Sequence, residues 1–148
     1  EAGQFVTLFF GVLDPSNHRL HFCNAGHTTP YLLAASTEPV HLESGGLVLG
    51  FLKETHYQDG LVAFPPGALL VIYSDGISEA FDPKGEEFGR DRLIDTVKRH
   101  QNQSSAHIVE AVLAAVRRHL DGQPAHDDMT LMVIRRPYDP AAILGDSI

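Results

Sequence analysis

The sequence predicts an α+β domain in which short strands come first, two helices follow, and a last strand closes the sheet. Three observations predict it. The first half alternates apolar runs with turn residues, the second half changes to helical spacing, and the apolar run 129–135 returns to strand character. Such a mixture favours layers of sheet and helix around one core.

Bulk composition limits the size and the partners of the domain. The chain has 148 residues, 43% hydrophobic and 20% charged, as is usual for one globular domain. Its formal net charge of −8 argues against a nucleic-acid partner, because phosphate binding needs clustered Lys and Arg. The single cysteine, Cys23, excludes a disulfide within the chain and fits a cytoplasmic location. No apolar run approaches the ~20 residues that span a membrane.

The first half is expected to form two hairpins and two further strands. Phe5–Leu13 is strongly apolar and ends at the turn residues 14–17, so it is expected to pair with Arg19–Asn24, whose Leu20 and Phe22 share one face. Tyr31–Ala35 and Val40–Leu42 are expected to pair next. The segment 44–46 is expected to be flexible, and the further strands are 60–64 and the run that ends at residue 75.

The second half has helical spacing. Leu93, Ile94 and Val97 predict a helix over Gly89–His100. A longer helix follows, capped by Ser104 or Ser105 and stopped by Gly122. Its expected apolar stripe consists of Val109, Val112, Leu113, Val116 and Leu120. The domain is expected to span 1–136, with a C-terminal tail over 137–148.

Two acidic motifs adjoin apolar strands. Asp75-Gly76 follows the run 68–73, and Asp127-Asp128 precedes the run 129–134. Each motif alone is explained by an ordinary turn or by solvated acids. The neighbouring charges of Asp127 and Asp128, however, repel unless a cation or a donor compensates them. Carboxylates at strand ends are donors that Mg²⁺ and Mn²⁺ prefer, so the pair of motifs indicates metal-assisted hydrolysis.

Five segments, taken in order, resemble a known enzyme family. They are Phe5–Asp14, Asn24-Ala25-Gly26-His27 with Pro30, Tyr73–Ala80, Gly85–Gly89 and Asp127–Leu131. Together they resemble the SpoIIE-like branch of the metal-dependent (PPM) serine/threonine phosphatases. The resemblance implies two packed antiparallel sheets flanked by helices. It also implies hydrolysis of phosphoserine or phosphothreonine with two Mn²⁺ or Mg²⁺ ions and an activated water, without a phosphoenzyme.

The resemblance also implies roles for individual residues. Asp75 and Asp127 match the family's metal ligands. Asp128 would either bind metal itself or lie beside the metal centre and orient water or its neighbour. Gly76, the second residue of the Asp-Gly motif, belongs to the same class of possible metal-binding or neighbouring residues. His27 would lie near the phosphate as an acid or hydrogen-bond donor, although a turn in which His27 packs locally explains its motif as well.

The family's first acidic motif lies upstream of the segment that matches Phe5, and this sequence does not contain it. The chain also begins without Met. We therefore expect an N-terminally truncated phosphatase domain that is inactive alone and binds Mn²⁺ weakly or not at all. A missing edge strand would also allow a homodimer to form.

The resemblance implies a role for the parent protein in bacterial partner-switching signalling. Its substrate would be a phosphorylated protein such as an anti-sigma-factor antagonist. The alternative is a catalytically silent module with the phosphatase fold, whose function is to bind another protein. Asp75 and Asp127 argue against that alternative, because a pure scaffold needs no carboxylates at both strand ends.

Overall fold

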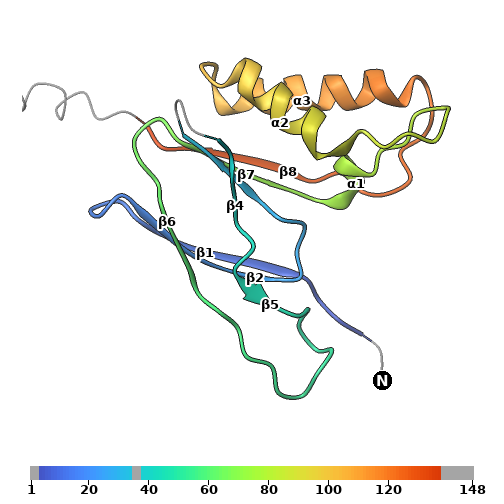
Figure 1. Cartoon of the computed structure of the whole chain (residues 1–148). Coiled ribbons are helices and arrows are strands. Elements are labelled where there is room, and N and C mark those ends of the chain that lie inside the picture. Colours follow the sequence, from blue (N-terminus) through green and yellow to red (C-terminus); the bar gives the residue numbers. More distant parts are fainter. Residues whose placement is uncertain (1–3, 35–37, 138–148) are drawn as a thin grey trace, which may run out of the picture.

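The computed structural model describes residues 4–34 and 38–137, and these form two stacked sheets with helices over one of them (Figure 1). The strands are β1 (Leu8–Asp14), β2 (Arg19–Ala25), β3 (Tyr31–Leu33), β4 (Val40–His41), β5 (Gly45–Gly46), β6 (Gly60–Ala63), β7 (Leu69–Tyr73) and β8 (Leu131–Arg135). The helices are α1 (Asp75–Ser78), α2 (Gly89–His100) and α3 (Ser105–Leu120).

Strand pairing confirms the predicted hairpins and separates the strands into two sheets. In one sheet β2 is central, paired antiparallel with β1 and β6 and parallel with β5. The other sheet has the antiparallel order β4-β3-β7-β8. The β1–β2 turn is held by Asp14, whose carboxylate accepts hydrogen bonds from Asn17 and from the backbone of Ser16. The bonds from Asn17 hold the pKa of Asp14 below its ordinary value.

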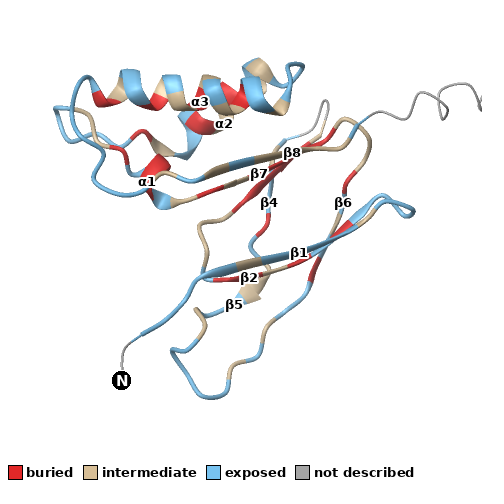
Figure 2. Cartoon of the chain, turned by 180° about the vertical axis from the view of Figure 1, so that it is seen from behind, coloured by how far each residue is buried: buried red, intermediate tan, exposed pale blue. Residues whose placement is uncertain are grey.

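Strands β3 and β7 join two hydrophobic cores, because alternate side chains of a strand point to opposite faces. Tyr31 and Val71 face the helices and pack in the core that contains Leu93 of α2 and Val112 of α3. Their neighbours in the strands pack instead against the other sheet, in a core of Leu20, Phe22, Leu32, Leu42, Phe64, Ala68 and Leu70. Figure 2 shows the helical layer, the layer that contains β7 and β8, and the β1–β2 layer in that order.

The buried stripe of α3 differs in part from the predicted one. Ile108, Val112 and Val116 are fully buried and Leu120 nearly so, a spacing of four residues that forms one line along the helix. Val112, Val116 and Leu120 are confirmed, whereas Val109 and Leu113 are only partly buried and Ile108 belongs to the stripe instead. The cap is Ser104, whose hydroxyl accepts a hydrogen bond from the backbone N–H of His107 at 3.2 Å.

The expectation of a flexible segment at 44–46 is wrong. Gly45 and Gly46 form β5 and pair with Asn24 and Ala25. The two backbones approach so closely that a Cβ at Gly45 would lie on the carbonyl oxygen of Asn24. Glycine is therefore required here for strand pairing. The composition of Ser-Gly-Gly indicated a flexible segment because it carries no information about this contact.

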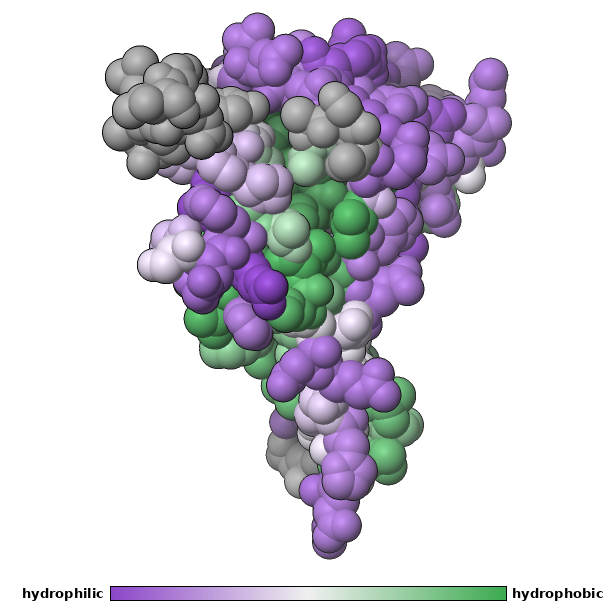
Figure 3. All heavy atoms as spheres, turned by 60° about the vertical axis from the view of Figure 1, so that its left-hand side comes forward, coloured by the Kyte–Doolittle hydropathy of each residue, from purple (hydrophilic) through white to green (hydrophobic). Residues whose placement is uncertain are grey.

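Strand β1 leaves apolar side chains exposed. Leu8, Phe10 and Val12 alternate on its outer face and are 43–57% exposed. Within the described residues β1 is an edge strand that pairs along its length with β2 alone. A space-filling view also shows hydrophobic residues gathered below the hydrophilic helical layer (Figure 3). The predicted tail 137–148 lies outside the described residues except for Pro137, and so does Ala35 of the third predicted strand.

Substitution of Ile108 tests the position of the α3 stripe. Ile108→Ala should lower the free energy of unfolding by about 2–5 kcal/mol, because it leaves a cavity between α3 and the sheet. Val109→Ala is the matched control and should cost less than about 1 kcal/mol. Urea unfolding followed by circular dichroism measures both. A larger loss for Val109 than for Ile108 would show that the stripe is misplaced.

Candidate metal centre

The pairing of β7 with β8 brings the two acidic motifs together. Tyr73 lies opposite Leu131, so the residues that follow β7 run beside the residues that precede β8. Ser74 continues the contact beyond the strands. Its backbone N–H donates to the carbonyl of Thr130 at 3.0 Å, and its hydroxyl donates to the carbonyl of Asp128 at 3.0 Å. The Thr130 N–H in turn donates to the Ser74 hydroxyl at 2.9 Å.

Ser74 thus fixes the Asp127-Asp128 segment against Asp75, a role that the sequence analysis did not assign to it. A hydroxyl residue directly after a buried strand and before an Asp is the only local signal. That signal is weak, because such residues are common helix caps. In the structure Ser74 stands at the N-cap position of α1, but its side chain does not cap that helix. It bonds across to the segment before β8 instead.

Both predicted metal ligands are exposed carboxylates on firmly placed backbone. Asp75 is the first residue of α1 rather than the last residue of a strand, and its Oδ1 accepts from the N–H of Gly76 at 3.0 Å. Asp127 lies four residues before β8, and its Oδ1 accepts from the N–H of Asp128 at 2.7 Å. Each carboxylate therefore keeps oxygen lone pairs available on its solvent side.

Gly76 is required by the close approach of the two motifs. It is buried, and a Cβ on it would lie 2.5 Å from the carbonyl oxygen of Asp128 and 3.3 Å from the carbonyl carbon of Asp127. Any other residue would push these two segments apart. The Asp-Gly dipeptide is thus more than a turn signal, since Gly76 lets the backbone after Asp75 pack against the backbone of Asp127 and Asp128.

The donor chemistry of this edge fits a hard divalent cation, but the shell is incomplete. Asp75, Asp127 and Asp128 offer carboxylate oxygens, and none of them forms an ion pair with another described residue. Oxygen-only donors suit Mg²⁺ and Mn²⁺. Across residues 4–34 and 38–137 no group of three or more His, Cys, Asp or Glu side chains is arranged to hold a metal ion. Metal binding by Asp75 and Asp127 therefore stays a prediction.

A small pocket of about 170 Å³ opens beside the carboxylates. It is lined by Gly76, Glu79, Phe81, His126 and Asp127. The His126 ring lies edge-on to Phe81, with centroids 6.0 Å apart. Glu79, the C-cap residue of α1, adds a carboxylate to this pocket beside Asp127.

Beneath the carboxylates the sheet is rigid and apolar. The rings of Tyr31 and Tyr73 stack with centroids 5.8 Å apart, and their hydroxyls lie 3.4 Å apart. Burial, together with the hydrogen bond to Tyr31, raises the pKa of the Tyr73 hydroxyl well above its ordinary value. Tyr73 is therefore a neutral packing residue that anchors Ser74 and Asp75, not an acid of the site.

The His27 motif is a local turn in the structure. The side chain of Asn24 accepts from the His27 N–H at 2.7 Å and donates to the His27 carbonyl at 3.0 Å. No hydrogen bond between described residues involves the His27 ring, which is partly buried. The antiparallel register of β3 and β7 places the residues before Tyr31 at the sheet edge that carries Asp75. A position near the phosphate stays a prediction for His27.

Two stacked, mainly antiparallel sheets with helices over one of them form a fold of the PPM phosphatase type, as the structural comparisons below confirm. The family model for stage II sporulation protein E (SpoIIE) matches residues 1–137. The chain belongs to the SpoIIE family.

Individual relatives agree with the family assignment. The chain is 32% identical to protein IcfG of Synechocystis over 92% of its length, and 28% identical to phosphoserine phosphatase RsbU of Bacillus subtilis over 92%. Among solved structures, the SiaA-PP2C domain of Pseudomonas aeruginosa matches 83% of the chain at 24% identity with a TM-score of 0.70. A SpoIIE phosphatase-domain structure from Bacillus subtilis matches 90% at 25% identity with a TM-score of 0.69.

The match covers only part of each relative. The chain spans 21% of IcfG and 40% of RsbU. It spans 48% of the SiaA-PP2C chain and 39% of the SpoIIE chain. No helix within residues 4–34 and 38–137 is long and apolar enough to cross a membrane.

Substitution of Gly76 tests the close approach of the two motifs. Gly76→Ala should destabilise the fold by about 2 kcal/mol through overpacking against Asp128, although alanine favours helices. Gly85→Ala is the control, because the space around Gly85 is open and only its positive φ of 81° opposes the change. Thermal unfolding compares the two. A Gly76→Ala protein as stable as the wild type would contradict the described contact.

Proposed function

We propose that this chain is part of a metal-dependent phosphatase domain that hydrolyses phosphoserine or phosphothreonine on a partner protein. One observation carries the proposal. The β7–β8 pairing, extended by Ser74, sets Asp75 and Asp127 at one sheet edge with Gly76 packed against Asp128. Membership of the SpoIIE family supports it, and so do the relatives RsbU and RsbP, which are named phosphoserine phosphatases.

In this proposal the residues of the chain bind the cations and orient the attacking water. Asp75 and Asp127 hold Mn²⁺ or Mg²⁺ through their solvent-facing carboxylate oxygens. When bound, such cations lower the pKa of a coordinated water and neutralise charge on the transferring phosphoryl group. Asp128 orients water or Asp127, and Ser74 keeps the backbone of Asp128 in place. The stacked, buried rings of Tyr31 and Tyr73 support the strand end from which Asp75 emerges.

The finer parts of the proposal concern the biological setting. We infer that the substrate is a phosphorylated protein of a bacterial partner-switching pathway, such as an anti-sigma-factor antagonist, and that the protein acts in the cytoplasm. Homodimer formation through the edge strand β1 also belongs to the proposal. The exposed apolar side chains of β1 support it.

The 148-residue chain alone is proposed to be inactive. Two metal-binding carboxylates cannot complete a two-cation shell, and the described residues provide no cluster that would add to them. Purified chain should therefore fail to hydrolyse p-nitrophenyl phosphate in the presence of Mn²⁺. Activity that copurifies with the chain, rather than with a contaminant, would contradict this part of the proposal.

Two substitutions in the parent protein test the phosphatase function. Asp75→Asn and Asp127→Asn should each lower Mn²⁺-dependent turnover of a phosphoserine peptide by about a hundredfold or more, since each removes a charged ligand. Asp121→Asn is the matched control. Asp121 is an exposed C-cap in the left-handed region, φ 44°, which asparagine adopts readily, and activity should be unchanged.

Other outcomes separate the alternatives. Full activity in both Asn variants would contradict the assigned site. A folded, metal-loaded parent that is inactive with every phosphopeptide would favour the binding module with a phosphatase fold.

A further inference from the structure

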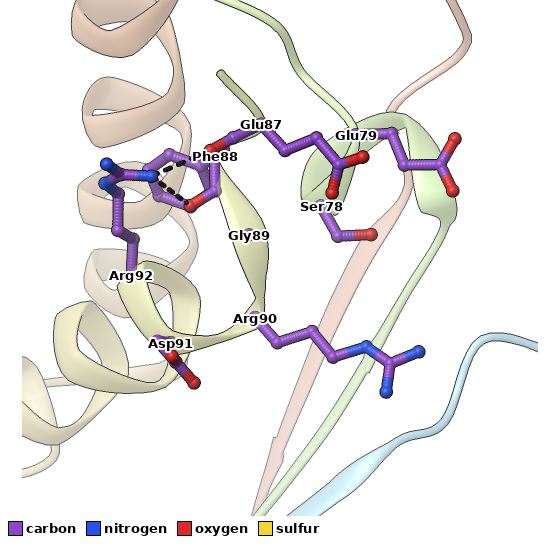
Figure 4. A pocket seen from close by; sticks show the side chains of 8 residues that line it. All are labelled: Ser78, Glu79, Glu87, Phe88, Gly89, Arg90, Asp91 and Arg92. Atoms are coloured by element: carbon purple, nitrogen blue, oxygen red, sulfur yellow. Dashed lines mark hydrogen bonds between the residues drawn. The ribbon is translucent and has the colours of Figure 1, made fainter.

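A second pocket adjoins the carboxylate edge on the side of the helices. It has a volume of about 570 Å³ and lies between the end of α1 and the start of α2, lined by Ser78, Glu79, Glu87, Phe88, Gly89, Arg90, Asp91 and Arg92. Figure 4 shows the Arg90 side chain extending below Ser78, with the carboxylates of Glu79 and Glu87 on the opposite side.

This pocket shares a lining residue with the small pocket of the candidate metal centre. Glu79 lines both it and the small pocket that contains Asp127. Ser78 and Glu79 follow Asp75 within about one turn of chain, so the second pocket begins close to the candidate ligand Asp75. A peptide residue two or three positions from a phosphoserine at the edge would reach it, because an extended chain advances about 3.3 Å per residue.

The two arginines of the pocket differ in their partners within the chain. The guanidinium of Arg92 donates to the carbonyls of Glu87 and Phe88 at 2.7 and 3.1 Å and lies 3.8 Å from the carboxylate of Glu86. Arg90 forms no hydrogen bond or ion pair with any residue of the described chain. Its charge lies close enough to the Tyr73 hydroxyl to favour ionisation of that phenol, against the larger effect of burial that raises the pKa.

Helix stability does not explain Arg90. It is the second residue of α2, where the positive end of the helix dipole favours acidic side chains and disfavours cations. Asp91, in the same first turn of α2, is the acidic residue that the helix dipole favours there. An exposed guanidinium that stabilises neither its helix nor its neighbours, and that lines a pocket beside a phosphatase site, is available for a ligand.

We propose that Arg90 is a specificity-determining residue that pairs with a carboxylate side chain of the phosphoprotein substrate, close in sequence to the phosphorylated residue. The inference rests on the proposed phosphatase function. A guanidinium forms two parallel hydrogen bonds with a carboxylate, which gives it geometric selectivity. Glu79, Glu87 and Asp91 also line the pocket and repel an anion. The Arg90 side chain extends away from these carboxylates, so the substrate acid approaches its guanidinium from the side of the sheet.

The parent protein and paired peptides test the proposal. One phosphoserine peptide carries Glu at the second and third positions on both sides of the phosphoserine, and the other carries Gln there. The wild type should show a kcat/KM about fivefold higher for the Glu peptide, the range of one partly exposed ion pair. Arg90→Ala should reduce that ratio to about one. Arg117→Ala should keep it, because Arg117 is exposed on α3 and lines neither pocket.

Charge reversal and direct binding complete the test. Arg90→Glu should prefer a third peptide with Lys at the same positions. Binding of fluorescent versions of the peptides, followed by anisotropy, separates this inference from the phosphatase function. A Glu preference in binding that Arg90→Ala removes supports the role of Arg90 even if the parent shows no turnover. A ratio that Arg90→Ala leaves unchanged, or equal binding of the Glu and Gln peptides by the wild type, overturns it.

Discussion

The antiparallel pairing of β7 with β8 is the constraint on which the site depends. Asp75 and Asp127 are far apart in the sequence, and α2 and α3 lie between them. The register of Tyr73 with Leu131, followed by the bonds of Ser74 to Asp128 and Thr130, returns the chain to the same edge. The contact at Gly76 then allows no space for a side chain between the two motifs. The position of the carboxylates is thus set by backbone pairing rather than by side-chain contacts.

The layered cores explain why that edge is rigid. β7 contributes Leu69, Val71 and Tyr73 to the core under the helices, and Leu70 to the core between the sheets. A strand buried on both faces cannot shift its register without exposing one set of apolar side chains. The helices α2 and α3 therefore act on the site indirectly, because their packing fixes the strand from which Asp75 emerges. The same packing places the start of α2, with Arg90, beside the end of α1.

Much of this architecture could be predicted from the sequence, because the spacing of apolar residues indicates which face of a strand or helix is buried. The β1–β2 hairpin, the range of α2 and both acidic motifs followed from spacing and turn residues alone. The resemblance to the phosphatases added the two-sheet arrangement. The missed features depend on contacts between distant segments. Gly45 forms a strand only because the Asn24 backbone lies beside it, and Ser74 acts only because Asp128 is brought to it. Val112, Val116 and Leu120 of the α3 stripe were predicted correctly, but Val109 was chosen in place of Ile108, because both are apolar and only tertiary packing distinguishes them.

The central claim is that Asp75 and Asp127 bind the same cation centre. Crystals of the parent protein soaked in Mn²⁺, with diffraction data collected at the manganese absorption edge, test it most directly. The account predicts anomalous density at this sheet edge, within coordinating distance, about 2.0–2.6 Å, of carboxylate oxygens from both residues. Density that contacts neither carboxylate, or manganese bound elsewhere in the domain while this edge stays free, would contradict it.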